Sequence, residues 1–242
     1  MISIITVVYN GESNIERTIN SVLSQSYQDF EYVVIDGKST DNTVNIINKY
    51  KDKIDYFVSE RDNGVYDAMN KGILVSKGEW IIFMNAGDTF NSNNTLSEIF
   101  CNNQYAGIDV LYGNVLCCYS NYEKLLRARS VDYLNYRMPF CHQSSFVRTC
   151  LAKEILFELK YKYSADYDFF HKLFLQKKSF HYVDMAISRY YPEGGLTYSN
   201  IINVFKEESL ISGKRNLRWL FHAVRAYVSF LKHRILKLQY NH

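Results

Sequence analysis

The sequence predicts an α/β fold in which a mixed, mostly parallel sheet is covered by helices on both faces. Residues 1–90 alternate short apolar, β-branched runs of strand length with segments of helical periodicity. The apolar runs are nearly continuous, as expected of strands buried on both sides, and turn residues such as Asn10–Gly11 and Asp36–Gly37 follow them. This alternation indicates parallel strands joined by crossover helices.

The elements of the first half can be placed in order. Four apolar runs predict strands at Ile2–Tyr9, Phe30–Ile35, Ile54–Ser59 and Trp80–Met84. Apolar residues at helical spacing predict the intervening helices over Glu12–Gln25, through Val44 to Tyr50, and over Tyr66–Ser76. Ser39, Thr40 or Asp41 can cap the second of these helices, and Gly78 stops the third.

The second half is less regular, and we expect it to complete the same domain with antiparallel strands. Strands are expected within Val110–Tyr119, with a turn at Gly113–Asn114, and in parts of Met138–Val147 and Phe180–Val183. Helices are expected over Asp166–Gln176, Ile201–Ile211 and Leu217–Leu238. The predicted organisation is a domain of residues 1–198, with halves 1–90 and 91–198, followed by C-terminal amphipathic, basic helices in 199–242.

Composition excludes several classes of protein. With 242 residues and 47% hydrophobic content, the chain suits one sizeable domain and is not broadly disordered. A net charge of +3 is too small to indicate nucleic-acid binding, and the five cysteines form no CxxC pair, which favours reduced thiols. The sequence contains neither a signal-peptide pattern nor an apolar run long enough to span a membrane, so we expect a cytoplasmic protein.

Polar residues gather where the predicted strands end. The first strand is followed by neither GxGxxG nor a P-loop motif, which argues against a dinucleotide-binding or P-loop site. Because parallel strands end at one edge of a sheet, the polar residues should meet there. They are Thr6, Tyr9 and Asn10; Asp36, Gly37 and Ser39; Glu60, Arg61 and Asp62; and Asn85 and Asp88. Such an edge can hold a nucleotide, with a carboxylate on the base, an aromatic ring stacked beside it and a metal ion on the diphosphate.

The segment Asn85-Ala86-Gly87-Asp88 follows the fourth predicted strand. A carboxylate, an amide and a flexible glycine at this place suit a hard divalent cation that carries phosphate oxygens. An ordinary Asx-Gly turn is the alternative interpretation of the same four residues.

The segment from Ile4 to Asp88 resembles the N-terminal half of family-2 glycosyltransferases with the GT-A fold. The matching residues are Thr6–Asn10, Ser21–Gln25, Val34–Gly37, Ser39–Asp41, Glu60–Asp67, Ala68–Gly72 and Gly78–Trp80. Asn85 to Asp88 lie where the family keeps its Asp-x-Asp motif, with Asn85 in place of the first Asp. The second half matches more loosely, at His142–Gln143 and Asp166–Asp168.

The resemblance implies a Rossmann-like GT-A domain that binds a nucleotide-diphosphate sugar with Mg²⁺ or Mn²⁺ and inverts the anomeric carbon. Residues 1–90 would bind the nucleotide sugar and 91–198 the acceptor. Asp36 would contact the base, Thr6 and Tyr9 would lie beside it, and Asp88 would bind the metal. The matched segments also place in the donor site Asn10, Ser39, Arg61, Asp67, Lys71, Asn85 and Ala86.

An inverting transfer also needs a base that takes the proton of the acceptor hydroxyl. Asp166, Phe169, Phe170, Leu173 and Phe174 share one face of the predicted helix, which places Asp166 at its start on the inward side. Asp168 is about 200° away around the helix and should point elsewhere. A helix-capping carboxylate is the alternative for Asp166, but the family keeps its base in an acidic pair that aligns with Ala165–Asp166.

Four further residues are candidates for contacts with acceptor or donor. They are His142, Gln143, Asp168 and Glu193. A histidine in a loop is often purely structural, and Glu193-Gly194-Gly195 can be either a loop over the donor or a plain turn.

The C-terminal segment is basic and amphipathic. Its cations are Lys214, Arg215, Arg218, Arg225, Lys232, Arg234 and Lys237, and apolar residues from Leu217 to Leu238 follow helical spacing. Such a helix can lie on an anionic membrane, which would make the protein peripheral on the inner face of the cell membrane. Packing on the domain, or on a second copy in a homodimer, is the alternative.

The predicted function is sugar transfer from a nucleotide-diphosphate sugar, with UDP favoured because Thr6, Tyr9 and Asp36 resemble a uracil pocket. The expected acceptor is a lipid-linked saccharide in surface-polysaccharide or O-antigen synthesis. Two alternatives stay open: a nucleotidyltransferase that makes a sugar nucleotide, and a non-catalytic sugar-nucleotide-binding protein. The absence of Arg and Lys from Thr6–Ser13 counts against the first, whereas Asn85 keeps the second open.

Overall fold

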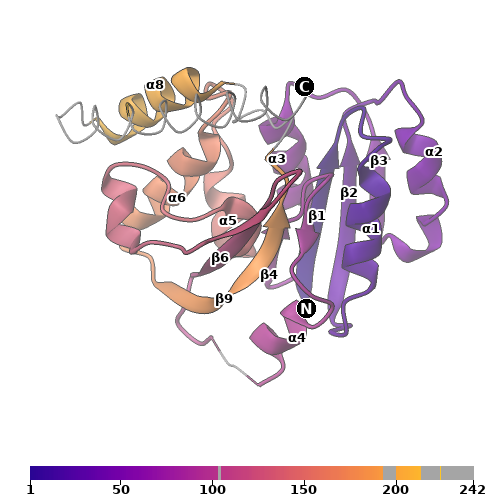
Figure 1. The fold of residues 1–242 in the computed structure, drawn as a ribbon, viewed down its shortest axis with the longest axis horizontal. Helices are drawn as coiled ribbons and strands as arrows, with labels where there is room; N and C mark the ends of the chain where they lie inside the picture. The colour runs from indigo at the N-terminus through magenta and orange to yellow at the C-terminus, as the bar shows by residue number, and fades with distance from the viewer. Residues whose placement is uncertain (103–104, 193–199, 214–223, 225–242) are drawn as a thin grey trace.

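The computed structural model describes residues 1–102, 105–192, 200–213 and 224 of the chain. Its first half alternates strands and helices as the sequence predicts (Figure 1). The strands are β1 (Ile2–Val8), β2 (Phe30–Asp36), β3 (Tyr56–Ser59) and β4 (Trp80–Phe83). The helices are α1 (Ile15–Leu23), α2 (Thr43–Asn48) and α3 (Val65–Val75), with a 3-10 turn η1 at Lys51–Lys53.

The second half adds shorter and more varied elements. Its strands are β5 (Thr89–Phe90), β6 (Val110–Cys118), β7 (Glu123–Leu126), β8 (Ser145–Arg148) and β9 (Phe180–Tyr190). Its helices are α4 (Thr95–Phe100), α5 (Thr149–Ile155), α6 (Ala165–Leu175) and α8 (Ile201–Ser212), with 3-10 turns η2 (Val131–Asn135) and η3 (His142–Ser144).

One mixed sheet unites both halves. Within the described residues its strand order is β3-β2-β1-β4-β8-β6-β9-β5, and β7 pairs with β6. The strands β3, β2, β1 and β4 are parallel, so their carboxyl ends share one edge. β8 is antiparallel to both β4 and β6 and thereby joins the halves, while β6 and β9 run parallel. The predicted fold class, a mixed and mostly parallel α/β sheet with helices on both faces, is confirmed.

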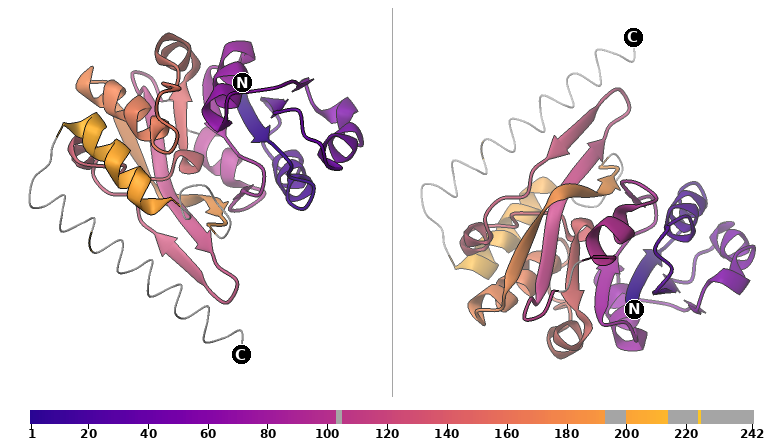
Figure 2. Two further views of the ribbon diagram at one scale, coloured as in Figure 1. Left: turned by 90° about the horizontal axis from the view of Figure 1, so that it is seen from above. Right: turned by 90° about the horizontal axis from the view of Figure 1, so that it is seen from below.

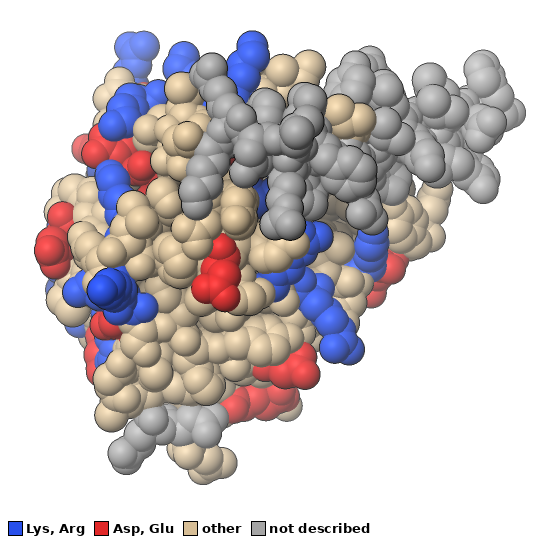
Figure 3. Space-filling model, turned by 90° about the vertical axis from the view of Figure 1, so that its left-hand side faces the viewer, with Lys and Arg blue, Asp and Glu red and all other residues tan. Residues whose placement is uncertain are grey.

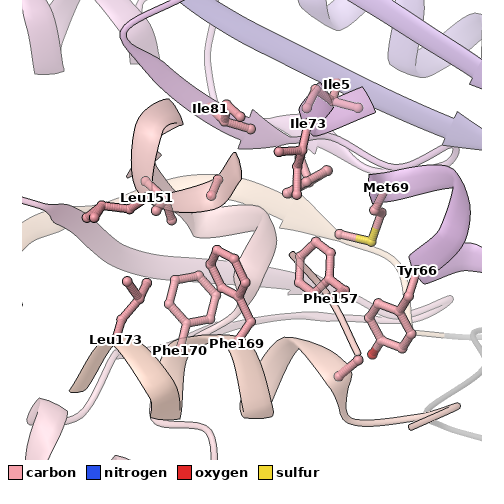
Figure 4. Close-up of a cluster of buried hydrophobic side chains, with 14 of the residues drawn as sticks. Ile5, Tyr66, Met69, Ile73, Ile81, Leu151, Phe157, Phe169, Phe170 and Leu173 are labelled. Atoms are coloured by element: carbon pink, nitrogen blue, oxygen red, sulfur yellow. The ribbon is translucent and has the colours of Figure 1, made fainter. Parts of the chain in front are cut away.

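Each face of the sheet carries its own core cluster. On one face, α3, α5 and α6 contribute Met69, Leu151 and Phe169, which meet Ile5 and Ile81 of the sheet (Figure 4). On the other face, α1 and α4 pack against side chains that alternate with the first set. All seven residues of β1 are buried, which agrees with a central strand covered on both sides.

Several features of the second half differ from the sequence prediction. The Gly113–Asn114 pair is not a turn: β6 continues through it, and the β9 partner jumps from Val183 to Ala186 in an irregular register. A Cβ at Gly113 would approach the Met185 carbonyl oxygen to 2.9 Å, so the glycine allows close strand contact there. β9 also extends well past the predicted Val183, and the helices α4 and α5 were not predicted.

The β6–β7 hairpin projects beyond the rest of the described chain in both views of Figure 2, and all four β7 residues are exposed. On the face drawn in Figure 3, acidic and basic side chains are interspersed over the described surface. No helix among the described residues is both long and apolar enough to cross a membrane. The predicted helix Leu217–Leu238 lies outside the described residues, apart from Val224.

Candidate active site

The segment Asn85–Asp88 forms a tight turn at the carboxyl end of β4. Gly87 has a φ of 107°, a backbone conformation that favours glycine, and the Asp88 amide donates to the Asn85 carbonyl at 2.9 Å. Helix α1 holds this turn in place. Thr18 Oγ1 donates to the Asp88 carbonyl oxygen at 2.8 Å, and Arg17 Nη2 donates to the Gly87 carbonyl oxygen at 2.6 Å.

The Asp88 side chain is a buried carboxylate, only 6% exposed. Gln143 Nε2 donates to Asp88 Oδ2 at 2.9 Å, and the Tyr191 amide approaches Oδ1 at 3.4 Å. Burial raises the pKa of Asp88 to about 6, although the Gln143 hydrogen bond and the nearby His142 and Arg17 partly offset that effect. The hydrogen bonds and nearby cations do not fully compensate the cost of burying the negative charge of Asp88, so a cation bound beside it would be stabilising.

Asn85 offers a second oxygen at the same turn. Its Oδ1 atom is buried and has no hydrogen-bond partner in the structure, while its Nδ2 atom lies 3.3 Å from His142 Nε2. A buried amide oxygen without a partner is costly, and such an oxygen is a suitable ligand for a hard cation. Among the described residues no group of three or more His, Cys, Asp or Glu side chains could hold a metal on its own. The residues Asn85 and Asp88 therefore fit a divalent cation whose remaining ligands come from phosphate or water.

His142 connects this turn to the predicted base. Its Nδ1 atom lies 3.2 Å from Asp166 Oδ2, so a proton on Nδ1 would be donated to the carboxylate. Nε2 would then accept from the Asn85 amide group, which agrees with the unpartnered Asn85 Oδ1. The predicted cation-binding turn and the predicted base thus belong to one connected site.

Asp166 is held from several directions at the start of α6. The Tyr66 hydroxyl of α3 donates to Asp166 Oδ1 at 3.1 Å, and the Tyr167 amide donates to the same oxygen at 2.9 Å. Figure 4 shows Tyr66 reaching from α3 toward the helix that carries Phe169 and Phe170. Burial raises the pKa of the Tyr66 phenol well above its usual value, so the hydroxyl stays protonated and can donate.

Asp168 points away from this group. Its carboxylate pairs with Lys172 Nζ at 2.9 Å, and the same Lys172 ammonium binds Glu158 at 3.0 Å. The structure thus separates Asp168 from Asp166 as the helical phase predicts, and it places no contact between Asp168 and the turn at Asn85–Asp88.

The loops after β1 and β2 form the other part of the site, and hydrogen bonds join them. The Asn10 amide donates to Ser39 Oγ, and the Thr40 amide donates to Asn10 Oδ1, both at 2.8 Å. The Tyr9 ring is 63% exposed beside them and can stack on a planar ligand.

Asp36 and Thr6 are both fully buried. The Asp36 carboxylate accepts hydrogen bonds from the Ser39 amide at 3.0 Å and from Ser59 Oγ at 2.6 Å. Thr6 Oγ1 donates to the Met84 carbonyl oxygen at 2.7 Å, within the core. Thr6 therefore does not share the exposed surface with Tyr9, and Asp36 can reach a base only if a neighbouring side chain moves aside.

The remaining predicted donor residues lie near the start of α3 or at the Asn85 turn. Arg61 is exposed, and its carbonyl oxygen accepts from Lys71 Nζ, which also pairs with Glu60 at 2.8 Å. Asp67 accepts from the Asn63 amide at 2.9 Å. Ala86 is half-buried in the turn, next to Asn85. Glu193 lies outside the described residues.

Sequence reasoning missed the residues that support the site. Arg17 holds the turn and also stacks over the Tyr191 ring, with its Cζ atom 3.8 Å from the ring centroid. Tyr66 contacts Asp166, the predicted base, across 100 positions of sequence. The only sequence signal for Tyr66 was its place beside Asp67 in a segment that matched the family, because contacts over such separations have no local pattern.

Comparison with known proteins gives consistent matches. Residues 3–156 match the family model described as Glycosyl transferase family 2. A Mycobacterium bovis protein named PGL/p-HBAD biosynthesis glycosyltransferase is 29% identical over 233 residues, which cover 94% of this chain and 91% of the relative. An uncharacterized glycosyltransferase of Rickettsia typhi is 30% identical over 230 residues, with 88% and 71% covered.

Solved structures show the same fold. S. aureus TarS 1–349 in complex with UDP has a TM-score of 0.67 and 23% identity, over 87% of this chain and 64% of that chain. Mannosyltransferase PcManGT from Pyrobaculum calidifontis, in complex with GDP-Man and Mn²⁺, has a TM-score of 0.64 and 15% identity, over 95% and 69%. This chain thus spans less than two thirds of the TarS fragment. These likenesses confirm the predicted GT-A fold.

Proposed function

Because this chain belongs to glycosyltransferase family 2, we propose that it transfers a sugar from a nucleotide-diphosphate sugar to an acceptor hydroxyl with inversion at the anomeric carbon. One observation carries the proposal. His142 contacts both Asn85 and Asp166, at 3.3 Å and 3.2 Å, so the turn proposed to bind the diphosphate and the proposed base lie in one connected group. An inverting transfer needs these two parts close together and on opposite sides of the sugar.

Asp166 is the proposed general base. It would take the proton of the acceptor hydroxyl while that oxygen attacks the anomeric carbon and the nucleotide diphosphate leaves. Tyr66 and His142 fix the carboxylate by donating to its two oxygens. Asp88 is not proposed for this role, because its carboxylate is buried and its two oxygens accept from Gln143 and from the Tyr191 amide.

A divalent cation, Mg²⁺ or Mn²⁺, would be held by Asp88 and the Asn85 amide oxygen, with His142 as a further neighbour. When bound, it would neutralise charge on the departing diphosphate.

Because only one carboxylate contributes to this proposed site, we expect weak metal binding to the free protein and stronger binding with nucleotide. In the presence of UDP, a divalent metal ion should raise the melting temperature. Asp88→Ala should remove this metal-dependent rise, whereas Asn85→Asp should keep or increase it. Metal binding that is tight without nucleotide and insensitive to Asp88→Ala would contradict this assignment.

The proposed donor is a UDP-sugar. The exposed Tyr9 ring and the buried Asp36 carboxylate supply a stacking surface and an acceptor for a base N–H group. UDP is bound by TarS, but GDP-Man is bound by PcManGT, so both nucleotides need testing. The proposed acceptor is a lipid-linked saccharide of a surface polysaccharide such as O-antigen. Association of residues 214–242 with an anionic membrane on the cytoplasmic side remains part of this proposal.

A donor panel tests the proposal. UDP-, GDP- and dTDP-sugars would be compared by thermal shift with and without Mn²⁺, and nucleotide release would be measured for each donor that stabilises the protein. We expect the largest shift with a UDP-sugar plus Mn²⁺, and release that Asp166→Asn abolishes. Stabilisation by GDP-sugars alone would change the proposed donor. Binding without any release, in the presence of saccharide acceptors, would favour a sugar-nucleotide-binding protein.

A further inference from the structure

The Glu207 carboxylate of α8 accepts backbone hydrogen bonds just before the start of α6, the helix that carries the proposed base. Glu207 Oε1 accepts the Lys162 amide at 2.9 Å, while Oε2 accepts the Tyr163 amide at 2.8 Å and the Ser164 amide at 2.9 Å. These three amides belong to consecutive residues that lead directly into α6, which begins at Ala165. One side chain that is 43 positions away from Ser164 thus binds the whole entry to α6.

The local sequence does not provide this cap. A helix start leaves backbone amides without partners, and a side-chain oxygen of the N-cap residue normally accepts from one of them. Ser164 is the N-cap residue of α6, but its side chain makes no such bond. Its hydroxyl instead faces the Val204 carbonyl oxygen of α8 at 3.4 Å. Glu207 therefore supplies acceptors at this entry and adds a negative charge, which the helix dipole favours at this end.

The position of Asp166 follows from this cap, because Asp166 is the second residue of α6. Its two oxygens meet Tyr66 at 3.1 Å and His142 at 3.2 Å, and both distances depend on how the chain enters the helix. We propose that Glu207 is a positioning residue for the base: it fixes the Lys162–Ser164 segment so that Asp166 faces the acceptor hydroxyl. This inference rests on the proposed function, since it takes Asp166 as the base.

Apart from the Ser164–Val204 contact, two further side chains of α8 lie against another part of the chain. Phe205 is buried and lies under the Arg137 guanidinium, with 5.2 Å from Cζ to the ring centroid. Glu208 is also buried, and it pairs with Arg137 at 3.8 Å. Docking of α8 and capping of α6 therefore use different side chains, which allows the two roles to be separated by substitution.

The test compares three variants of the full chain. Glu207→Gln replaces one acceptor oxygen with an NH₂ group that would face backbone N–H donors. Glu207→Asp keeps the carboxylate on a shorter side chain. Phe205→Leu weakens the docking of α8 and leaves the cap intact. Nucleotide release is measured with Mn²⁺ and the donor from the UDP-, GDP- and dTDP-sugar panel that gives the fastest release by the wild type.

We expect Glu207→Gln to lower kcat by about tenfold to a hundredfold with an unchanged KM for the donor, as misplacement of a reacting group does. Glu207→Asp should recover part of the loss. Phe205→Leu should lower the melting temperature and leave kcat unchanged. Hydrogen exchange of the Lys162, Tyr163 and Ser164 amides should become faster in Glu207→Gln and stay slow in Phe205→Leu.

Two results would overturn the proposal: wild-type kcat in Glu207→Gln, or an equal loss of kcat in Phe205→Leu. The variant Asp166→Asn, measured in parallel, separates this inference from the proposed function. If Asp166→Asn stays active, the base assignment fails and this proposal fails with it. If Asp166→Asn is inactive while Glu207→Gln is fully active, only the role of Glu207 is rejected.

Discussion

The two halves of this site are built in different ways. On the donor side, the loops after β1 and β2 bind each other directly, and adjacent parallel strands bring them together. On the base side, Asp166 receives contacts from α3 and η3, and its helix is capped from α8. The donor side is therefore a product of strand topology, whereas the base side depends on side chains brought together from distant segments.

This difference predicts how the halves respond to substitution. Changes on the donor side should act on nucleotide affinity, because the loops that they alter form the proposed nucleotide site. Changes around Asp166 should act on kcat with little effect on affinity, since the proposed base would act on the acceptor hydroxyl and not on the nucleotide. Four experiments, in order of decreasing expected effect, test this division.

Removing the proposed base should have the largest effect. Asp166→Asn keeps the size of the side chain but cannot take a proton, so kcat for sugar transfer should fall by about 10²–10⁴-fold. Donor affinity, measured by calorimetry, should be unchanged. Asp168→Asn is the matched control, because Asp168 binds Lys172 on another side of the same helix. A greater loss in Asp168→Asn than in Asp166→Asn would transfer the base role to Asp168.

Residues 91–242 should also contribute to the pH dependence of stability, through Glu208. Burial raises the pKa of Glu208 to about 7, while Arg137 lowers it and the nearby Asp166 raises it. The folded state therefore holds a proton that the unfolded state releases near its ordinary pKa, so this residue destabilises the fold as the pH rises from about 4.5 to about 7. The effect is on the order of 3 kcal/mol.

Glu208→Gln removes this proton exchange. The difference in unfolding free energy between Glu208→Gln and the wild type, measured in urea, should favour the variant more at pH 8 than at pH 5. Taking the difference cancels the titration of other groups to first order. A difference that is constant with pH would show that Glu208 is already ionised in the folded protein throughout this range.

Local patterns predicted the elements that form the proposed donor side, although Thr6 lies in the core and not on the surface beside Tyr9. The parallel strands, the turn at Asn85–Asp88 and the paired loops follow from apolar runs and from motifs only a few residues long. The phase of α6 was also predictable, because helical geometry alone separates Asp166 from Asp168. The contacts that support Asp166 were not predictable. Tyr66 and Glu207 are distant from Asp166 or its loop in sequence, and no periodicity relates them. His142 was a candidate for contact with acceptor or donor, but its contact with Asp166 had no sequence signal.

The same contrast explains the errors in the fold. Gly113–Asn114 resembles a turn locally, but Gly113 is required by the approach of β9, which begins 67 residues later at Phe180. Helix α5 has seven residues and starts directly after β8, too short for a clear apolar period. Local patterns therefore indicate local structure, and they fail where a distant strand or helix determines the conformation.

Asp36→Ala probes the donor side. Whether Asp36 binds the base or holds Ser39 and Ser59 in place, its loss leaves two part-buried donors without their acceptor. UDP affinity should fall by about 1–3 kcal/mol, with kcat at saturating donor unchanged. Asp55→Ala is a useful control, because Asp55 also accepts a buried backbone amide, that of Tyr32, but does so away from the loops. Unchanged UDP affinity in Asp36→Ala would remove Asp36 from the site.

The smallest expected effect is that of Tyr66→Phe, which tests whether Tyr66 acts on the proposed base or on nucleotide binding. The substitution keeps the ring that packs on Phe157, at 5.5 Å between centroids, and removes only the hydroxyl that donates to Asp166. His142 and the Tyr167 amide still hold the carboxylate. One lost hydrogen bond of about 1 kcal/mol should therefore lower kcat by about fivefold, with no change in KM for the donor. Tyr182→Phe, which loses a hydroxyl bonded to Asp184, is the control and should retain the wild-type kcat. An increase in donor KM without a change in kcat would instead show that Tyr66 acts on nucleotide binding. Tyr66 and α3 would then belong to the donor side of the site, and not to the base side.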